Sequence, residues 1–360
     1  MAKKILLVDD SALMRSVLGD IINRDKRFFV EDKARDGLEA LEMLRQKHYD
    51  GVVLDVNMPR MDGMQLLDKI REEKIHTRVM ISSTDTTEGS RVAMEALDKG
   101  ALDFVHKPER ASECRSDAFG AEFLNTLAAV CEGHETGDAL MSRMDSMRNV
   151  RRVAEGLGVR TPQRAGSGNK IVAIASSTGG PKSLQSVIPR LPKSLGAPVV
   201  LVQHMPGGFT NTLADRLNGM SEIRVKEGAE GDVLEKGTVY IAKGSTHMYV
   251  RHQNGRHYLH FKDGPPRENV KPCANYMYES LMDSHYDEIV CVVLTGMGAD
   301  GLEGISNLKK RKKVHVISQN ADTCIVYGMP KAVESAGLSD EVSPLDDIAE
   351  DIVENVGVTV

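Results

Sequence analysis

The chain reads Ile171-Val172-Ala173-Ile174-Ala175-Ser176-Ser177-Thr178-Gly179-Gly180-Pro181-Lys182-Ser183-Leu184 at the point where an apolar, β-branched segment meets a turn. Apolar residues then recur at helical spacing from Leu184 to Leu191, so the predicted order is strand, tight turn, helix. A serine at such a turn can stand above the sheet edge, where N–H groups of the next helix face a developing oxyanion. The stretch differs by one residue from the nucleophile-elbow pattern G-x-S-x-G, because Ala175 replaces the first glycine.

Two other interpretations of this stretch stay open on its local sequence. Runs of Ser, Thr and Gly before a helix are often only caps and turns. The stretch could also hold a nucleotide phosphate, as in a dinucleotide-dependent enzyme. However, 179–183 lacks the G-x-x-x-x-G-K spacing, and G-x-G-x-x-G is absent as well. The choice therefore depends on whether a base and an orienting acid occur elsewhere.

Length and composition indicate a two-domain globular protein. The chain has 360 residues, 41% hydrophobic and 27% charged. A net charge of -6 gives no electrostatic reason to expect nucleic-acid binding. Five widely spaced cysteines without a C-x-x-C pair argue against a zinc site or a disulfide framework. The first strand begins within a few residues of the start and no apolar run reaches membrane-spanning length, so we expect a cytoplasmic protein without membrane insertion.

The first domain alternates short apolar strands with amphipathic helices. This β-α repeat predicts a parallel sheet with helices on both faces and a ligand site beyond the carboxyl ends of the strands. A further apolar-periodic helix at 117–131 completes the domain. The predicted strands are Lys4–Val8, Phe28–Asp32, Gly51–Val56, Arg78–Ser82 and Leu102–Val105.

Acidic residues gather at the predicted strand ends of this domain. Asp9 and Asp10 close the first strand and Asp55 the third, while Ser82 and Lys107 follow from the fourth and fifth. Carboxylates that converge on one crevice repel one another unless a cation joins them, and Mg²⁺ suits such an all-oxygen site. With the metal and Lys107 screening the charge, one carboxylate can attack a phosphoryl group.

These residues resemble those of a response-regulator receiver domain. The resemblance covers residues 1 to about 110 and implies a (βα)5 flavodoxin-like fold, Mg²⁺ as cofactor and a chemotaxis histidine kinase as phosphodonor. By position, Asp55 matches the phosphoacceptor. The other matches are Asp9 and Asp10 as the acidic pair around the metal, Asn57 as the backbone-carbonyl ligand, Ser82 as the switch hydroxyl, Phe104 as the switch aromatic, and Lys107 as the lysine before a proline.

Between the domains the periodicity fades. Residues 140–170 carry seven Lys or Arg and two acidic residues, and 165–168 are Gly/Ser-rich. A solvated tether is the simplest interpretation. Docking of the two domains through a basic helical face is an alternative, and a nucleic-acid arm lacks aromatic interleaving. We expect a receiver domain at 1–133, a linker at 134–167 and a second domain at 168–360.

The second domain offers a base and an acid at further strand ends. His204 follows a predicted strand at 198–202, and Asp300 lies in a glycine-rich loop after the buried run 289–294. Since sequential strands are usually neighbours, His204 can reach a crevice shared with Ser177. His247, in a glycine-bearing loop, is a rival base on this evidence, and the triad is defined by geometry rather than chain order. Three more histidines lie on a predicted hairpin and are expected to be solvated: His252, His257 and His260.

Residues from about 168 to 360 resemble the catalytic domain of the CheB family of chemotaxis protein-glutamate methylesterases. The resemblance implies a doubly wound, mostly parallel-sheet hydrolase domain. It also implies Ser177 as nucleophile, His204 as general base, Asp300 as the residue that orients it, and the Met297 N–H with the Thr178 hydroxyl as oxyanion donors. Ser176 stands where the family usually has alanine, and 273–275 departs from the usual Ser-x-Asp. The matching segments are 175–180, 203–206, 294–301, 319–320 and 327–330.

The two resemblances together imply a regulated enzyme. Phosphorylation of Asp55 activates a serine esterase that hydrolyses glutamyl methyl esters on the cytoplasmic helices of methyl-accepting chemoreceptors, with no cofactor at the esterase site. The same site can deamidate a receptor glutamine, and the unphosphorylated receiver is expected to cover it. Two alternatives are a response regulator whose output domain is a non-catalytic interaction module, and a transcription regulator, which the acidic charge balance and large sheet-rich output domain disfavour.

Overall fold

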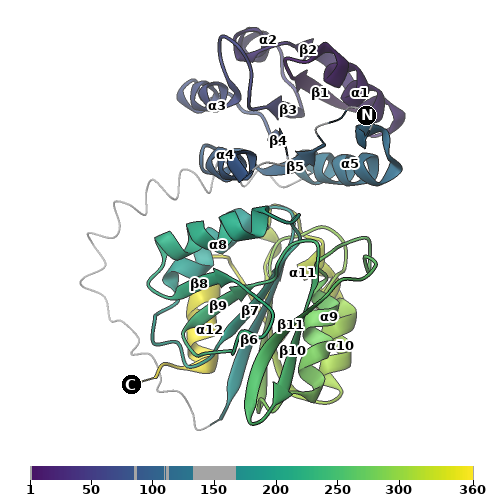
Figure 1. Cartoon of the computed structure of the whole chain (residues 1–360). Helices are drawn as coiled ribbons and strands as arrows, with labels where there is room; N and C mark the ends of the chain where they lie inside the picture. Colours follow the sequence, from purple (N-terminus) through teal and green to yellow (C-terminus); the bar gives the residue numbers. More distant parts are fainter. Residues whose placement is uncertain (1, 85–86, 109, 111–112, 133–167, 360) are drawn as a thin grey trace, which may run out of the picture. The chain divides into compact units, whose positions relative to one another are not determined.

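The computed structural model describes residues 2–84, 87–108, 110, 113–132 and 168–359. The chain divides into two compact units, one up to Gly133 and one from His134 onward. Both are built on parallel sheets flanked by helices, which confirms the predicted α/β class (Figure 1). The linker predicted at 134–167 lies outside the described residues.

The first unit is a five-stranded parallel sheet in the order β2-β1-β3-β4-β5. Its strands lie within two residues of the predicted ones, because each is a short apolar run bounded by polar residues. The strands are β1 (Lys3–Val8), β2 (Phe28–Ala34), β3 (Gly51–Asp55), β4 (Val79–Thr84) and β5 (Asp103–Lys107). The helices are α1 (Ala12–Arg24), α2 (Gly37–Gln46), α3 (Gly63–Glu72), α4 (Thr87–Asp98), the 3-10 helix η1 (Glu113–Arg115) and α5 (Asp117–Glu132).

Side-chain caps fix the loops at the carboxyl edge of this sheet. Ser11 accepts a hydrogen bond from the Met14 N–H at the start of α1, and Asp36 caps α2 in the same way. Asp62 and Gln65 form a reciprocal capping box at the start of α3. Each cap satisfies N–H groups that the first helical turn leaves unpaired, and so fixes where the preceding loop ends.

The second unit is a seven-stranded parallel sheet in the order β14-β13-β12-β6-β7-β9-β8, with a separate antiparallel hairpin, β10–β11. Helices α9 and α10 lie on one side of the sheet and α12 on the other (Figure 1). The strands are β6 (Lys170–Ser176), β7 (Val199–Gln203), β8 (Arg224–Glu227), β9 (Thr238–Ile241), β10 (His247–Gln253), β11 (Arg256–Lys262), β12 (Glu288–Val293), β13 (Lys313–Gln319) and β14 (Glu341–Ser343). The helices are α7 (Gly180–Val187), η3 (Ile188–Arg190), α8 (Phe209–Met220), α9 (Ala274–Ser280), η4 (Leu281–Asp283), α10 (Leu302–Lys309), η5 (Ala321–Thr323), α11 (Met329–Ser335) and α12 (Ile348–Val356).

The chain reverses its direction of winding at the centre of this sheet. From β6 it proceeds to β7, then to β8 at the edge of the sheet and back to β9 between β7 and β8, and it later places β12 on the other side of β6. In open parallel sheets a crevice forms beyond the carboxyl ends of the strands at such a switch point. The strand order therefore predicts a site above β12, β6 and β7.

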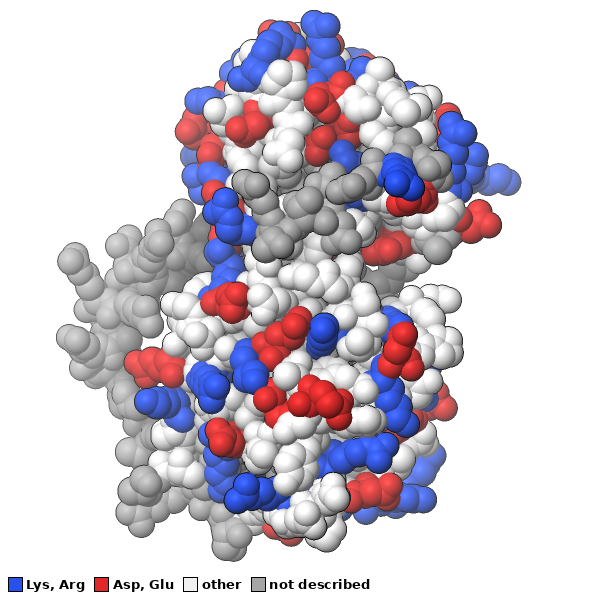
Figure 2. All heavy atoms as spheres, viewed as in Figure 1, with Lys and Arg blue, Asp and Glu red and all other residues white. Residues whose placement is uncertain are grey.

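The surface carries charges of both signs. Lys/Arg and Asp/Glu side chains are interspersed on the visible face of each unit (Figure 2). Within the part of the chain that the structure describes, no helix has the length and apolar composition needed to cross a membrane.

The hairpin contradicts one expectation, since His257 is not solvated. Strand alternation turns His257 inward, where 7% of its surface is exposed and its ring stacks on Tyr286 at 3.9 Å. The His252 ring lies 4.8 Å away and stacks on His285, and the His257 Nε2 accepts a hydrogen bond from the His285 N–H at 3.1 Å. Burial lowers the pKa of His257 to about 4, helped by His252, His285 and Lys312.

We predict that acid destabilises the folded protein through His257. The unfolded chain binds a proton near pH 6.5 and the folded chain only near pH 4, so stability is lost as pH falls through this window, by up to about 3 kcal/mol. Urea unfolding at pH 7, 5.5 and 4.5 measures the effect. His257→Gln keeps an acceptor without titrating and should reduce the slope, whereas His260→Gln on the same strand should not. Equal slopes in the wild type and His257→Gln would contradict the prediction.

Candidate active site and phosphorylation site

Ser177 follows the last residue of β6 and is half-buried. Its N–H donates to the Thr295 carbonyl at 3.0 Å, and its carbonyl accepts from the Gly180 N–H at 2.7 Å in the turn before α7. Ser176, by contrast, is fully buried, and its hydroxyl donates to Gln203 Oε1 at 2.7 Å. Of the two adjacent serines, Ser177 is thus the one whose side chain reaches the sheet edge.

His204 lies beside this turn, immediately after β7. Ser176 pairs with Gln203 in the β6–β7 register, and the His204 N–H donates to the Ser176 carbonyl at 3.1 Å. The His204 Nε2 lies 2.7 Å from Asp300 Oδ2 and therefore carries a proton toward the carboxylate. Its Nδ1 is buried and has no hydrogen-bond partner among the described residues. The structure thus leaves one imidazole nitrogen, on a residue whose backbone is bonded to Ser176, with no partner among the residues that the structure describes.

Asp300 lies in the loop between β12 and α10, with 3% of its surface exposed. Besides His204, it accepts hydrogen bonds from the N–H groups of Ala274 and Asn275 and from the Cys273 thiol. Burial raises the pKa of Asp300, but the hydrogen bonds, led by that from His204, outweigh burial and hold this pKa below its usual value. The carboxylate is therefore an ion that can orient the imidazole.

His247, the rival base, lies elsewhere. It is the first residue of β10, in the two-stranded hairpin rather than the seven-stranded sheet. Its Nε2 donates to the Pro265 carbonyl at 3.0 Å and its ring packs edge-on against Tyr276. His204 is thus the histidine that the structure joins to Asp300.

The loop after β12 packs closely against the turn that follows β6 and begins with Ser177. The Thr295 hydroxyl bonds to the Thr178 carbonyl at 3.0 Å, which ties this loop to the residue after Ser177. A Cβ added to Gly296 would lie 2.7 Å from the Ser177 Cβ, closer than real Cβ contacts allow. The next residue, Met297, has a 40% exposed side chain. Thr178 and Met297 therefore flank Ser177, where the sequence predicts oxyanion donors.

Gln203 is a further residue of this site, for which the sequence analysis predicts no role. It is 2% exposed, and its Nε2 donates to the Ser177 carbonyl at 2.9 Å and to the His204 carbonyl at 3.3 Å. One amide therefore links the backbones of the predicted nucleophile and base. Its position as the last residue of β7, just before His204, was the available signal.

The first unit brings its predicted acidic residues together. Ligand oxygens of Asp9, Asp10 and Asp55 all lie within 4.8 Å of one another. The Lys107 ammonium lies 2.8 Å from Asp9 Oδ2 and 3.1 Å from Asp55 Oδ2. Three carboxylates beside one lysine leave excess negative charge, and their oxygens are the donors that Mg²⁺ prefers. This cluster therefore fits a magnesium ion.

The surroundings of Asp55 fit an acceptor group. Burial raises the pKa of Asp55, Lys107 opposes the rise, and the Asp9 carboxylate adds to it. Ser82 is its register partner on β4, and the buried Ser82 hydroxyl has no hydrogen-bond partner among the described residues. Phe104 is 8% exposed on β5, next to β4, and Asn57 is exposed beyond β3.

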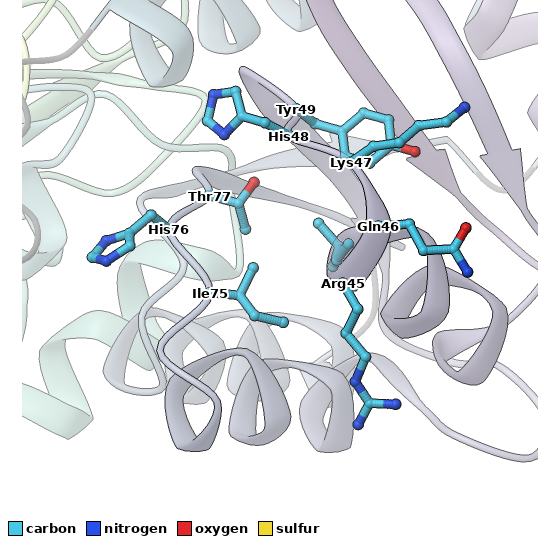
Figure 3. A pocket seen from close by; sticks show the side chains of 9 residues that line it. Arg45, Gln46, Lys47, His48, Tyr49, Ile75, His76 and Thr77 are labelled. Carbon is cyan, nitrogen blue, oxygen red and sulfur yellow. The ribbon is translucent and has the colours of Figure 1, made fainter.

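A shallow depression of about 270 Å³ lies elsewhere on the first unit (Figure 3). It is lined by the end of α2 with the residues that follow it, 44–49, and by the loop 75–77 before β4. Both segments lie at the amino ends of the strands, whereas Asp55 lies at the carboxyl end of β3. The depression is therefore separate from the predicted phosphoacceptor, Asp55.

Both units match family models. Residues 172–352 match the model described as CheB methylesterase, and residues 5–118 match the response regulator receiver domain. The two matches cover the two sites described above.

Relatives align over nearly the whole chain. A protein-glutamate methylesterase/protein-glutamine glutaminase of Geobacillus kaustophilus is 39% identical over 98% of this chain and 99% of its own length. One of Pyrococcus abyssi is 40% identical over 98% of this chain and 93% of its own. This chain is also similar to the crystal structure of the Thermotoga maritima CheB methylesterase catalytic domain. The alignment covers 52% of this chain and 99% of that domain, with 42% sequence identity and a TM-score of 0.51.

We predict that Gly296→Ala lowers ester hydrolysis at least about tenfold, because the added methyl must push the Ser177 turn and the 295–298 loop apart. Gly219→Ala is the matched control, since a Cβ there meets nothing within 4 Å. Steady-state kinetics and thermal unfolding of both variants separate lost activity from lost folding. Full activity of a folded Gly296→Ala protein would contradict the proposed close packing.

Proposed function

The chain belongs to the CheB family of methylesterases, and we propose that Ser177, His204 and Asp300 hydrolyse glutamyl methyl esters on methyl-accepting chemoreceptors. The proposal assigns the receiver to 1–133, the linker to 134–167 and the esterase to 168–360, and places the reaction in the cytoplasm. The observation that carries it is the His204–Asp300 contact of 2.7 Å, which commits Nε2 to the carboxylate and leaves the Nδ1 lone pair without a partner among the described residues.

The first half of the reaction forms an acyl-enzyme. The Ser177 hydroxyl attacks the ester carbonyl while the His204 Nδ1 takes its proton, and Asp300 stabilises the resulting imidazolium. The tetrahedral intermediate collapses when the C–O bond to the methoxy group breaks. His204 returns the proton to that oxygen, and methanol leaves.

The negative oxygen of the intermediate needs hydrogen-bond donors. We assign this role to the Met297 N–H and the Thr178 hydroxyl, supported by the position of both residues beside Ser177. Donors aimed at the developing charge typically contribute about 10²- to 10³-fold in rate.

The second half of the reaction regenerates the serine. A water molecule loses a proton to His204 and attacks the acyl carbon, the bond to Ser177 breaks, and His204 reprotonates the serine oxygen. The receptor then carries a glutamate. The same steps release ammonia from a glutamine side chain, because an amide passes through an equivalent intermediate. Deamidase activity is therefore part of the proposal.

The receiver supplies the control. We assign Asp55 as the acceptor of a phosphoryl group from a chemotaxis histidine kinase. Asp9, Asp10, Asp55 and the backbone carbonyl of Asn57 would hold Mg²⁺, which neutralises charge on the transferring phosphoryl group when bound. Lys107, the unpartnered Ser82 hydroxyl and Phe104 form the switch, and phosphorylation releases the esterase from inhibition by the receiver.

We predict that Ser177→Ala lowers methanol release from methylated receptor membranes at least about 10³-fold, because the attacking oxygen is lost. The protein should still accept phosphate on Asp55 from acetyl phosphate. Ser176→Ala is the matched control: its hydroxyl is buried against Gln203, so turnover and labelling by a serine-directed fluorophosphonate should persist. If Ser177→Ala kept turnover and Ser176→Ala lost it, the nucleophile assignment would be wrong.

We predict that acetyl phosphate with Mg²⁺ raises methanol release by the wild-type protein several-fold, and that Asp55→Asn abolishes this increase while keeping the basal rate. Chelation of Mg²⁺ should have the same effect as Asp55→Asn, since the carboxylate cluster then lacks its cation. An unchanged response of Asp55→Asn would place the regulatory phosphorylation elsewhere.

A further inference from the structure

Segment 273–275, which is the N-cap and the first two residues of α9, is bonded to the loop of Asp300. The Cys273 thiol and the Asn275 N–H donate to Asp300 Oδ1 at 3.1 and 2.9 Å, and the Ala274 N–H donates to Oδ2 at 2.6 Å. Cys273 and Asn275 are fully buried. The carboxylate therefore has four donors, counting His204, and one of them is a side-chain thiol.

The Asn275 side chain also bonds to the start of α10. Its Oδ1 accepts from the Gly301 and Gly304 N–H groups at 3.0 and 2.6 Å, which fixes the start of α10. A Cβ on Gly304 would lie 2.8 Å from the Asn275 Cα, so the two chain segments touch at backbone distance. The Asn275 side chain thus joins α9 to the end of the loop that carries Asp300.

Glu268 sets the orientation of the Asn275 amide. The Asn275 Nδ2 donates to Glu268 Oε1 at 2.7 Å, so the amide must turn its oxygen toward α10. Glu268 and Asn269 have φ angles of 54° and 62° in a tight turn closed by hydrogen bonds between Arg267 and Val270. Non-glycine residues adopt this left-handed region at an energetic cost and persist there where surrounding contacts hold them.

Arg267, the first residue of this turn, connects the turn to two helices. The Arg267 guanidinium bonds to Glu279 on α9 and Glu303 on α10 and lies over the Tyr276 ring. The turn is thus attached to both helices whose starts meet at Asp300.

We propose that Cys273, Asn275 and Glu268 form one positioning unit that sets the orientation and effective charge of Asp300, and through it the pH range in which His204 acts as a base. The inference rests on the proposed function. None of the three residues is assigned a role in bond making: Cys273 and Asn275 act on Asp300 directly, and Glu268 acts through Asn275.

The direction of the effect follows from the donors. Each hydrogen bond draws negative charge from the carboxylate, so removing one leaves Asp300 a stronger partner for a protonated imidazole. Burial and the nearby Asp300 raise the pKa of Cys273, so the thiol stays protonated as a donor. Without that donor, His204 holds its proton to higher pH and activity is lost earlier on acidification. The titratable or charged groups around Asp300 are His204, Glu268, Cys273, Tyr278 and Glu279.

The test is the pH profile of kcat/KM for methanol release by the full-length protein. Cys273→Ala should move the acidic limb to higher pH by about half a unit or more, while Cys273→Ser, which keeps a donor, should restore it. Cys291→Ala is the matched control, because this fully buried thiol lies on β12 and has no bond to Asp300. A purely structural role of Cys273 would lower the amplitude without moving the limb.

A second pair of variants tests Asn275 and Glu268. Asn275→Asp sets a carboxylate against Glu268 and Asp300 and should shift the limb in the same direction with a lower kcat. Adding Glu268→Gln to this variant restores a hydrogen bond of reversed direction, from the new amide at position 268 to the new carboxylate at position 275. The double variant should recover most of the kcat and reverse most of the shift of the limb. Glu268→Gln in the otherwise wild-type protein should bring no such gain. Additive effects of the two changes would overturn the proposal. If Ser177→Ala is inactive but these profiles do not move, the positioning unit is wrong while the triad stands.

Discussion

The esterase unit depends on the adjacency of three parallel strands, β12, β6 and β7, whose carboxyl ends meet at one edge of the sheet. The register that pairs Ser176 with Gln203 sets Ser177 and His204 side by side at that edge. A shift of one residue would turn position 204 to the opposite face, because successive side chains of a strand alternate. The buried apolar residues of β6 and β7 oppose such a shift, because both faces of these strands are covered and each side chain would have to repack in the opposite layer. The core thus fixes the geometry of the reactive groups.

The two units handle buried carboxylates in opposite ways. Asp300 is surrounded by hydrogen-bond donors, and the hydrogen bonds outweigh burial, so its pKa falls. Asp55 shares one lysine with Asp9, and burial prevails, so its pKa rises. A carboxylate whose oxygens all accept hydrogen bonds is suited to hold a neighbouring side chain in place. A carboxylate with few hydrogen-bond donors is suited to bind a cation and to accept a phosphoryl group. The difference in donors thus supports the positioning role proposed for Asp300 and the acceptor role proposed for Asp55.

Much of this arrangement could be predicted from the sequence. Buried strands such as β12 are continuous apolar runs, so their ends are visible, and the residues just beyond them include Ser177, His204 and Asp300. The roles of Cys273 and Asn275 could not be found in this way, because they depend on a contact between chain segments about 26 residues apart that no periodicity marks. The prediction that His257 is solvated was wrong, because a histidine on a hairpin strand can face either side of the hairpin. Its burial depends on packing against Tyr286, which the sequence pattern does not mark.

Close backbone contact is a further constraint on the site. A Cβ on Gly180 would lie 2.0 Å from Gln203 Oε1, one on Gly296 2.7 Å from the Ser177 Cβ, and one on Gly328 2.6 Å from the Gly296 carbonyl oxygen. None of these three glycines has a positive φ, so turn geometry does not explain them. Their neighbours require them instead, since Gly328 lies against the backbone of residues 296–298, Gly180 lies against the Gln203 side chain, and Gly296 lies against Ser177 and Met329. The Met297 N–H, which we propose as an oxyanion donor, follows Gly296 in the chain, so the packing at Gly296 and Gly328 constrains where this N–H lies.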